Sequence, residues 1–316
     1  AITSNDASAG TCENQLLSTN CTLDAPSNFA FSRARASASA DTSSAVTRAC
    51  GRSSASVQEL DPWEAPFRPA MPVTAYALAA SRHMHEFGTT REQLASVAVA
   101  ARSWAAMNPG AWSREPLSVD DVLASRMVAD PLTLRDCCLV TDGGAAIVVT
   151  SAERAAALRR PPVFVLGTGE AHSHRHITGM PSLTTTAAAR SGAAAFAEAG
   201  VTPREVDVAQ LYDAFTITPV LFLEDLGFCP KGDGGPFAAS GAIAPGGSLP
   251  LNTNGGGLSY THPGMYGLHA IVEGVRQLRG ECEERQVPAC EIAVAHGNGG
   301  VLSSQATLVL GSAATA

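Results

Sequence analysis

The sequence predicts a layered α/β fold in which helices cover both faces of a sheet of buried strands. Short apolar runs alternate with helix-length segments through the second half of the chain, and this alternation is typical of such a fold. Several of the helix-length segments stop at a glycine, the residue that most readily adopts the left-handed conformation of a helix end. With 316 residues, the chain is long enough for about two domains.

The composition excludes several classes of protein. Apolar residues make up 45% of the chain and charged residues 16%, which is typical of a globular protein and not of a disordered or fibrous one. The net charge is -8 and Lys231 is the only lysine, so we expect no nucleic-acid partner. No apolar run reaches 18 residues and no export signal is recognisable, so we expect no membrane span. The eight cysteines form no Cys-x-x-Cys pair, which favours a reduced, cytoplasmic protein.

Residues 1–60 differ from the rest of the chain. They contain 12 serines and 12 alanines and show no sustained strand or helix periodicity. Such a segment buries little apolar surface. A GC-rich gene read in the wrong frame, or a disordered segment, would give this composition, and we treat 1–60 as an atypical segment that precedes the first domain.

Residues 61–160 begin with a predicted helical hairpin. Apolar residues at helical spacing lead to Gly88, which we expect to end the first helix. Residues 89–92, Thr-Thr-Arg-Glu, are typical of a capping box for a second helix that ends near residue 107. The apolar run 139–149 predicts a buried strand, and a short helix should follow it at 152–159.

Residues 161–316 alternate between predicted strands and helices and form a second domain. We expect buried strands at 163–166, 206–211, 292–295 and 306–310, and helices at 184–199, 215–226 and 264–278. A glycine follows each helix within two residues. Residues 202–205, Thr-Pro-Arg-Glu, are typical of a further capping box.

Three turns of this second domain carry polar groups beside small residues or glycines, at positions where open α/β sheets bind ligands. The first is Tyr-Asp-Ala-Phe at 212–215, in which we interpret Asp213 as the N-cap of the following helix. The second, 252–267, combines a glycine run with His262. The third is His-Gly-Asn-Gly-Gly at 296–300, a predicted loop whose bare amides suit an oxyanion. Each turn alone is also compatible with an ordinary structural role.

In this order the three turns resemble the C-terminal half of the thiolase superfamily, which carries Asn-Glu-Ala-Phe, Asn-x-x-Gly-Gly…Gly-His-Pro and Cys-x-Gly-Gly. The resemblance covers residues 61–312 and is closest to the lipid-transfer, sterol-carrier type, which shares the Leu-Gly-Phe-Cys-Pro-Lys-Gly stretch at 226–232. It implies a thiolase-like layered fold with a complete C-terminal domain at 161–316. Residues 61–160 would then be the loop domain and the last strand and helix of an incomplete N-terminal domain. The resemblance also implies at least a homodimer and an OB-fold/zinc-ribbon partner protein.

The resemblance further implies a site that processes an acyl-CoA, with coenzyme A as part of the substrate and no separate cofactor. His262 is the expected oxyanion donor, and His296 replaces the family's second catalytic cysteine as a proton shuttle with an ordinary pKa near 6.5. Tyr212 replaces the asparagine of the first motif and would donate its hydroxyl, or act as acid or base if its pKa were lowered. The expected oxyanion and substrate-binding residues are Asn252, Gly256, Gly257, Asn298 and Gly299.

Three functions remain open at this point. The first is acyl transfer between CoA esters, the second is a retro-aldol lyase acting on a CoA-linked side chain, and the third is a non-catalytic lipid-transfer or interaction subunit. No cysteine lies in the family's nucleophile motif, and a cysteine Sγ within about 4 Å of the His262 ring would favour acyl transfer. His172, His174 and His176 alternate along the chain, but no acidic or cysteine partner stands at ligand spacing, so we expect no metal.

Overall fold

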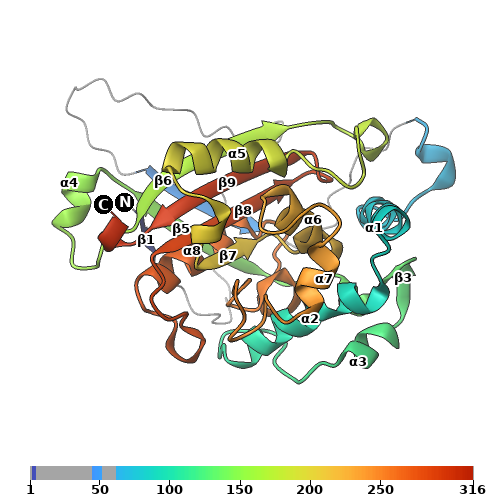
Figure 1. Cartoon of the computed structure of the whole chain (residues 1–316), viewed down its shortest axis with the longest axis horizontal. Coiled ribbons are helices and arrows are strands. Elements are labelled where there is room, and N and C mark those ends of the chain that lie inside the picture. Colours follow the sequence, from blue (N-terminus) through green and yellow to red (C-terminus); the bar gives the residue numbers. More distant parts are fainter. Residues whose placement is uncertain (1, 5–44, 52–61, 316) are drawn as a thin grey trace, which may run out of the picture.

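The computed structural model describes residues 2–4, 45–51 and 62–315, with side chains over 62–315 (Figure 1). Most of the atypical segment 1–60 therefore lies outside the described residues. The helices are α1 (Val73–Phe87), α2 (Arg91–Ala106), α3 (Val119–Leu123), α4 (Ala152–Ala156), α5 (Ala188–Ala199), α6 (Ile217–Asp225), α7 (Gly234–Ala239) and α8 (Gly267–Leu278). The strands are β1 (Ile2–Ser4), β2 (Ala45–Gly51), β3 (Met127–Ala129), β4 (Leu132–Thr133), β5 (Gly143–Val149), β6 (Phe164–His172), β7 (Val208–Leu211), β8 (Ile292–Gly299) and β9 (Ser304–Gly311).

The main sheet has the strand order β6-β9-β8-β7 and is mixed. β7 runs parallel to β8, whereas β9 is antiparallel to both β6 and β8. The predicted strands of the second domain are all present, but β8 extends four residues beyond the expected end. Residues 296–299 pair with 304–307 across the β8–β9 ladder, so the prediction of a loop at this place is wrong.

Helices cover both faces of the main sheet, as predicted, and the pleat of β8 shows the two sides. Val294 belongs to the core cluster that also contains residues of α5 and α6, while Ala293 and Ala295 belong to the cluster around α8. α5 lies along β6 and β9 (Figure 1). α8 packs between the main sheet and a second sheet of order β1-β5-β2. This layering of helices and sheets is the α/β arrangement that the sequence predicts.

α1 and α2 form the predicted helical hairpin, which shares the larger core cluster with α6. α1 ends at Gly88, whose φ is 72°. The predicted capping box is displaced by one residue, because Thr90 and Gln93 form it in place of the residues at 89 and 92. The Thr89 hydroxyl instead lies 2.7 Å from Nδ1 of His83. The hairpin is held to α6 by packing and by the buried contact of His83 Nε2 with the Glu224 carboxylate at 2.9 Å.

Some predicted boundaries and burial patterns differ from the structure. α5, α6 and α8 begin two to four residues later than expected. For α5 the reason is visible, since the Thr186 amide donates to Asp225 before the helix starts. β5 begins at 143 and β6 is an edge strand, and both are largely half-exposed where the sequence suggested full burial. No helix in the described part of the chain is long and apolar enough to cross a membrane.

Candidate functional site

Tyr212 and His262 come together where β7 ends. Tyr212 directly follows the strand, and His262 follows a π-helical turn, η5 (Gly256–Tyr260). The two rings are perpendicular, with centroids 5.4 Å apart, and the Tyr212 hydroxyl donates to the Gly264 carbonyl over 3.5 Å. The Thr141 hydroxyl accepts the His262 amide at 3.0 Å. The structure therefore joins the first two predicted turns into one site.

Both rings are neutral polar groups at neutral pH. Burial lowers the pKa of His262 to about 4, so the imidazole carries no charge. Its Nε2 atom is buried and has no hydrogen-bond partner among the residues that the structure describes. Burial, together with the neighbouring Tyr76 and Cys138, raises the pKa of Tyr212, which keeps its proton. The lowered pKa that would make Tyr212 an acid or base is thus the opposite of what its surroundings produce.

Asp213 lies beneath the glycine run and is fully buried. Its carboxylate accepts the amides of Gly257 at 2.6 Å and Leu258 at 3.3 Å. Asp213 therefore caps η5, and the prediction that it caps α6 is wrong, because Thr216 precedes that helix. Burial raises the pKa of Asp213 to about 7, although the two amides partly oppose this shift.

The glycines at 256 and 257 allow the chain to pass close to Asp213 and His262. Gly256 has φ +64°, and a Cβ there would overlap the Asp213 carboxylate. A Cβ on Gly257 would lie 2.8 Å from Cδ2 of His262. The Gly256 amide donates to Asn254 Oδ1 at 2.8 Å, and Gly257 donates to Asp213. Both amides thus hold the turn that carries His262.

Asn252 fastens this turn to β7. Its side chain accepts the Leu211 amide at 2.7 Å and donates to the Leu211 carbonyl at 2.8 Å. Asn252 itself has a positive φ of 50°, a conformation that asparagine tolerates better than most residues. The polar atoms of Asn252 are therefore used inside the protein, which gives this residue a positioning contact with the strand beside Tyr212.

His296 lies apart from the Tyr212–His262 pair in its side-chain contacts. It is fully buried, with Nδ1 2.9 Å from the Thr307 hydroxyl and Nε2 2.9 Å from Oε1 of Gln305. Burial lowers its pKa to about 4, where the sequence suggested an ordinary value near 6.5. Asn298 bonds to Tyr76 and Gln305, and Gly299 ends β8. The predicted third turn thus supplies buried polar contacts within the fold.

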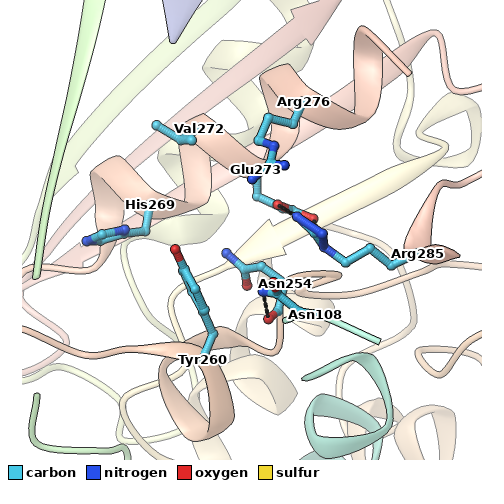
Figure 2. Close-up of a pocket in the computed structure, with 8 residues that line it drawn as sticks. All are labelled: Asn108, Asn254, Tyr260, His269, Val272, Glu273, Arg276 and Arg285. Carbon is cyan, nitrogen blue, oxygen red and sulfur yellow. Dashed lines mark hydrogen bonds and ion pairs between the residues drawn. The ribbon is translucent and has the colours of Figure 1, made fainter. Parts of the chain in front are cut away.

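Residues that the sequence left unassigned also support the site. Tyr266 stacks near His262, with ring centroids 6.4 Å apart, and its hydroxyl donates to Asn254 at 2.8 Å. A cavity with a volume of about 10 Å³ is lined by Asn254 and by the buried ion pair of Glu273 with Arg285. Figure 2 shows how these side chains lie. That volume suits about one water molecule. The polar groups behind the site are therefore closely packed.

The five cysteines with described side chains are protonated thiols. Burial is the largest cause that raises their pKa values, to about 12 for Cys137, Cys229 and Cys290 and to a higher value for Cys138 and Cys282. Cys138 lies near enough to Asp213 and Tyr212 for their charges to interact: Asp213 contributes to the raised pKa of Cys138, and Cys138 contributes to the raised pKa of Tyr212. A thiol with a raised pKa is a poor nucleophile.

The alternating histidines show no metal-ligand arrangement. His172 bonds to Ser304 and Glu170, each at 2.9 Å, and His174 bonds to the Val301 carbonyl at 2.8 Å. Within the part of the chain that the structure describes, no three histidine, cysteine, aspartate or glutamate side chains gather into a metal-binding group.

Comparisons with known proteins place this chain in a family. Residues 169–312 match the family model described as "Thiolase C-terminal domain-like". An acetyl-CoA acetyltransferase of Methanothermobacter thermautotrophicus is 40% identical over 245 residues, which are 75% of this chain and 62% of that protein. A 17-hydroxy-3-oxo-4-pregnene-20-carboxyl-CoA lyase of Mycobacterium tuberculosis is 38% identical over 220 residues, 66% of this chain and 55% of the relative.

The solved structures agree with the sequence relatives. The structure named "Ltp2-ChsH2(DUF35) aldolase" superimposes on this chain with a TM-score of 0.78 at 34% sequence identity. The match covers 85% of this chain and 72% of the chain in that structure. The matches span between 42% and 62% of the length of the curated relatives. The predicted resemblance, including its sterol-carrier branch, is confirmed, and the chain belongs to the thiolase superfamily.

Proposed function

We propose that this chain processes a CoA thioester through an enolate and cleaves a carbon–carbon bond of its acyl group by a retro-aldol reaction. The observation that carries the proposal is the Tyr212–His262 pair, with rings 5.4 Å apart and with Nε2 of His262 unpartnered among the described residues. The neutral imidazole of His262 and the phenol of Tyr212 can both donate a hydrogen bond to an oxyanion as it develops, and neither group has to change its protonation state first.

The reaction requires stabilisation of one oxygen atom. A general base takes the hydroxyl proton of a β-hydroxyacyl-CoA, the bond between Cα and Cβ breaks, and its electron pair moves into the thioester as an enolate. The protonated base then returns a proton to Cα, which gives a carbonyl compound and a shorter acyl-CoA. We assign His262 Nε2 and the Tyr212 hydroxyl as donors to the thioester oxygen, with the Tyr212 hydroxyl turning away from its long 3.5 Å contact with the Gly264 carbonyl. One such donor is worth about 2.7–4 kcal/mol in comparable sites.

Acyl transfer is the second candidate, and the likeness to an acetyl-CoA acetyltransferase favours it. That reaction needs a thiolate nucleophile. The described thiols have raised pKa values, while Cys12, Cys21 and Cys50 lie outside the described side chains. The protonated state of Cys138 beside Tyr212 therefore favours a reaction without an acyl-enzyme, and the name of the M. tuberculosis relative, a CoA lyase, points in the same direction.

We further propose that the chain works in an assembly in the cytoplasm. The sequence predicted a homodimer and an OB-fold/zinc-ribbon partner, and the name of the solved aldolase joins two components, Ltp2 and ChsH2(DUF35). Size-exclusion chromatography with light scattering at micromolar concentration tests the homodimer directly.

A panel of CoA esters tests the proposed function. The full chain is incubated with a β-hydroxyacyl-CoA branched at Cβ and, separately, with acetoacetyl-CoA plus free CoA, and products are followed by mass spectrometry. We expect cleavage of the first ester, with kcat reduced about 10²–10³-fold in His262→Ala and Tyr212→Phe. His172→Ala is the matched control, because this histidine is exposed on β6. Thiolysis of acetoacetyl-CoA would support acyl transfer, and lipid binding without turnover would contradict both reactions.

A further inference from the structure

Six buried or half-buried side chains form a continuous line of hydrogen bonds through the main sheet, from α5 to α1. We call it the polar chain, and its members are Ser191, Thr307, His296, Gln305, Asn298 and Tyr76. Its successive contacts measure 2.9, 2.9, 2.9, 2.8 and 2.9 Å. The strand register produces it, because residues 296 and 298 of β8 face 307 and 305 of β9.

One contact determines which atom is the donor in each hydrogen bond of the polar chain. Nε2 of Gln305 donates to the Leu302 carbonyl at 3.1 Å, and a carbonyl can only accept. The Gln305 amide nitrogen therefore also faces Oδ1 of Asn298, so that Nδ2 of Asn298 donates to the Tyr76 hydroxyl oxygen. Tyr76 in turn donates to the Gly300 carbonyl at 3.3 Å.

The direction in the other half of the line follows from the same amide. Oε1 of Gln305 can only accept, so the neighbouring Nε2 of His296 carries a proton. Since burial keeps His296 neutral, its Nδ1 carries none and accepts from the Thr307 hydroxyl. Every donor from Thr307 to Tyr76 thus points the same way, and hydrogen bonds arranged in this manner strengthen one another.

The polar chain touches the candidate site at two places. The Tyr212 amide donates to the His296 carbonyl at 3.0 Å, where β7 and β8 run side by side. The Tyr76 ring packs on Phe215, three residues beyond Tyr212, with ring centroids 4.5 Å apart. α1 of the loop domain is thereby held against the turn that carries Tyr212.

We propose that the polar chain positions the Tyr212 turn against α1 and that Gln305 and Tyr76 are positioning residues of the site. His296 then acts as a fixed Nε2–H imidazole inside the fold and takes no part as a proton shuttle. The effect on catalysis rests on the proposed function. The tautomer and the direction of the hydrogen bonds depend on the fold alone.

A measurement without substrate tests the direction. In the 15N NMR spectrum of the full chain at pH 7, we expect the shifts of a neutral His296 with its proton on Nε2. Gln305→Glu replaces the amide by a carboxylate beside Nε2–H, which should raise the pKa of His296 by about 1–3 units. Gln286→Glu is the control, because Gln286 bonds to Gln277 and Val287 and touches no member of the polar chain. A proton on Nδ1, or an unchanged His296 pKa in Gln305→Glu, overturns the inference.

Kinetics test the effect on the site. Tyr76→Phe removes one oxygen from a buried ring, and it should lower kcat about 10-fold or more while KM stays within about 3-fold, because a displaced catalytic group slows the reaction more than binding. Gln305→Glu should do the same. If both variants keep kcat within 2-fold of an active parent, the positioning role is wrong. If the parent cleaves no CoA ester while the His296 shifts are as expected, the proposed function fails and the polar chain stands as a structural element only.

Discussion

Two histidines contact Tyr212, His262 through its ring and His296 through its backbone carbonyl. They differ in what their ring nitrogens contact. Burial lowers the pKa of both His262 and His296 to about 4. His296 bonds through both nitrogens, whereas Nε2 of His262 has no partner among the described residues. Buried polar atoms are almost always hydrogen-bonded in native proteins. The unsatisfied nitrogen thus marks His262 as the histidine with a hydrogen bond left to make, whereas both ring nitrogens of His296 are used within the fold.

The glycine-rich segments around the two histidines differ in the same way. Before His262, the chain bends through η5 and passes so close to Asp213 that residue 256 has no room for a side chain. After His296, the segment continues as a regular strand with ladder partners. Similar compositions therefore serve a tight approach in one region and the end of an ordinary paired strand in the other.

The largest expected effect comes from removing each histidine in turn. His262→Ala should reduce kcat about 10²–10³-fold and leave most of the stability, since no partner loses a bond to Nε2. His296→Ala opens a cavity beside Phe222 and strands Gln305 and Thr307, so the free energy of unfolding should fall by about 3–5 kcal/mol. Urea unfolding followed by circular dichroism, together with the CoA-ester assay, checks both. The reverse pattern would show that His296 is the histidine used in the reaction.

The sequence was sufficient for much of the architecture because its signals are local. Apolar spacing and a following glycine located α1, and the Thr-Pro-Arg-Glu pattern at 202–205 gave the capping contact seen in the structure. Local patterns of this kind depend on few distant contacts, so one sequence reports them well. The expectation that Tyr212 and His262 share a site came instead from the resemblance to the thiolase superfamily, and the two rings do meet.

The remaining features depend on distant partners. Tyr76 fits an apolar helical stripe, and nothing near it in sequence shows that its hydroxyl meets Asn298, 222 residues away. The His-Gly-Asn-Gly-Gly composition favours a turn, but the ladder to β9 keeps residues 296–299 extended. The role of Asp213 was missed for the same reason, since the amides it caps lie 44 and 45 residues further along the chain.

A smaller effect should separate the two glycine-rich segments. Gly257→Ala places a Cβ 2.8 Å from the His262 ring, which must move. We expect a loss of about 1–3 kcal/mol in the free energy of unfolding, as for other overpacked positions, together with reduced turnover. Gly299→Ala is the matched control, because its Cβ would lie 3.4 Å from that of Ser304, an ordinary contact. Equal losses in the two variants, measured by urea unfolding, would remove the distinction between the segments.

The stability of the turn before His262 should depend on pH through Asp213, whose carboxyl group caps it. The pKa of Asp213 is raised from 3.8 to about 7, so the folded state holds a proton that the unfolded state has lost between these values. The contribution of Asp213 is therefore present below about pH 4 and disappears as the pH rises to about 7.

Asp213→Asn removes this dependence. The stability of the variant relative to the parent should increase with pH between about 4 and 7, with a slope of at most about 1.4 kcal/mol per pH unit. The histidines contribute equally to both proteins and cancel in the difference. Urea unfolding at half-unit pH steps gives the slope, and a flat difference would mean that Asp213 is ionised in the folded protein well below pH 7.

The smallest expected effect lies at the far end of the polar chain. Ser191→Ala removes the hydroxyl that contacts Thr307, at a cost of about 0.5–1.5 kcal/mol in the free energy of unfolding. Thr307 still donates to His296, because the Leu302 carbonyl holds Gln305 in place and Gln305 holds the proton on Nε2. The 15N shifts of His296 should therefore match those of the parent, and the environment of His262 should be unchanged. A shift of the proton to Nδ1 in this variant would show that the direction is set from α5, and the contrast between the two histidines would then depend on Ser191 and not on Gln305.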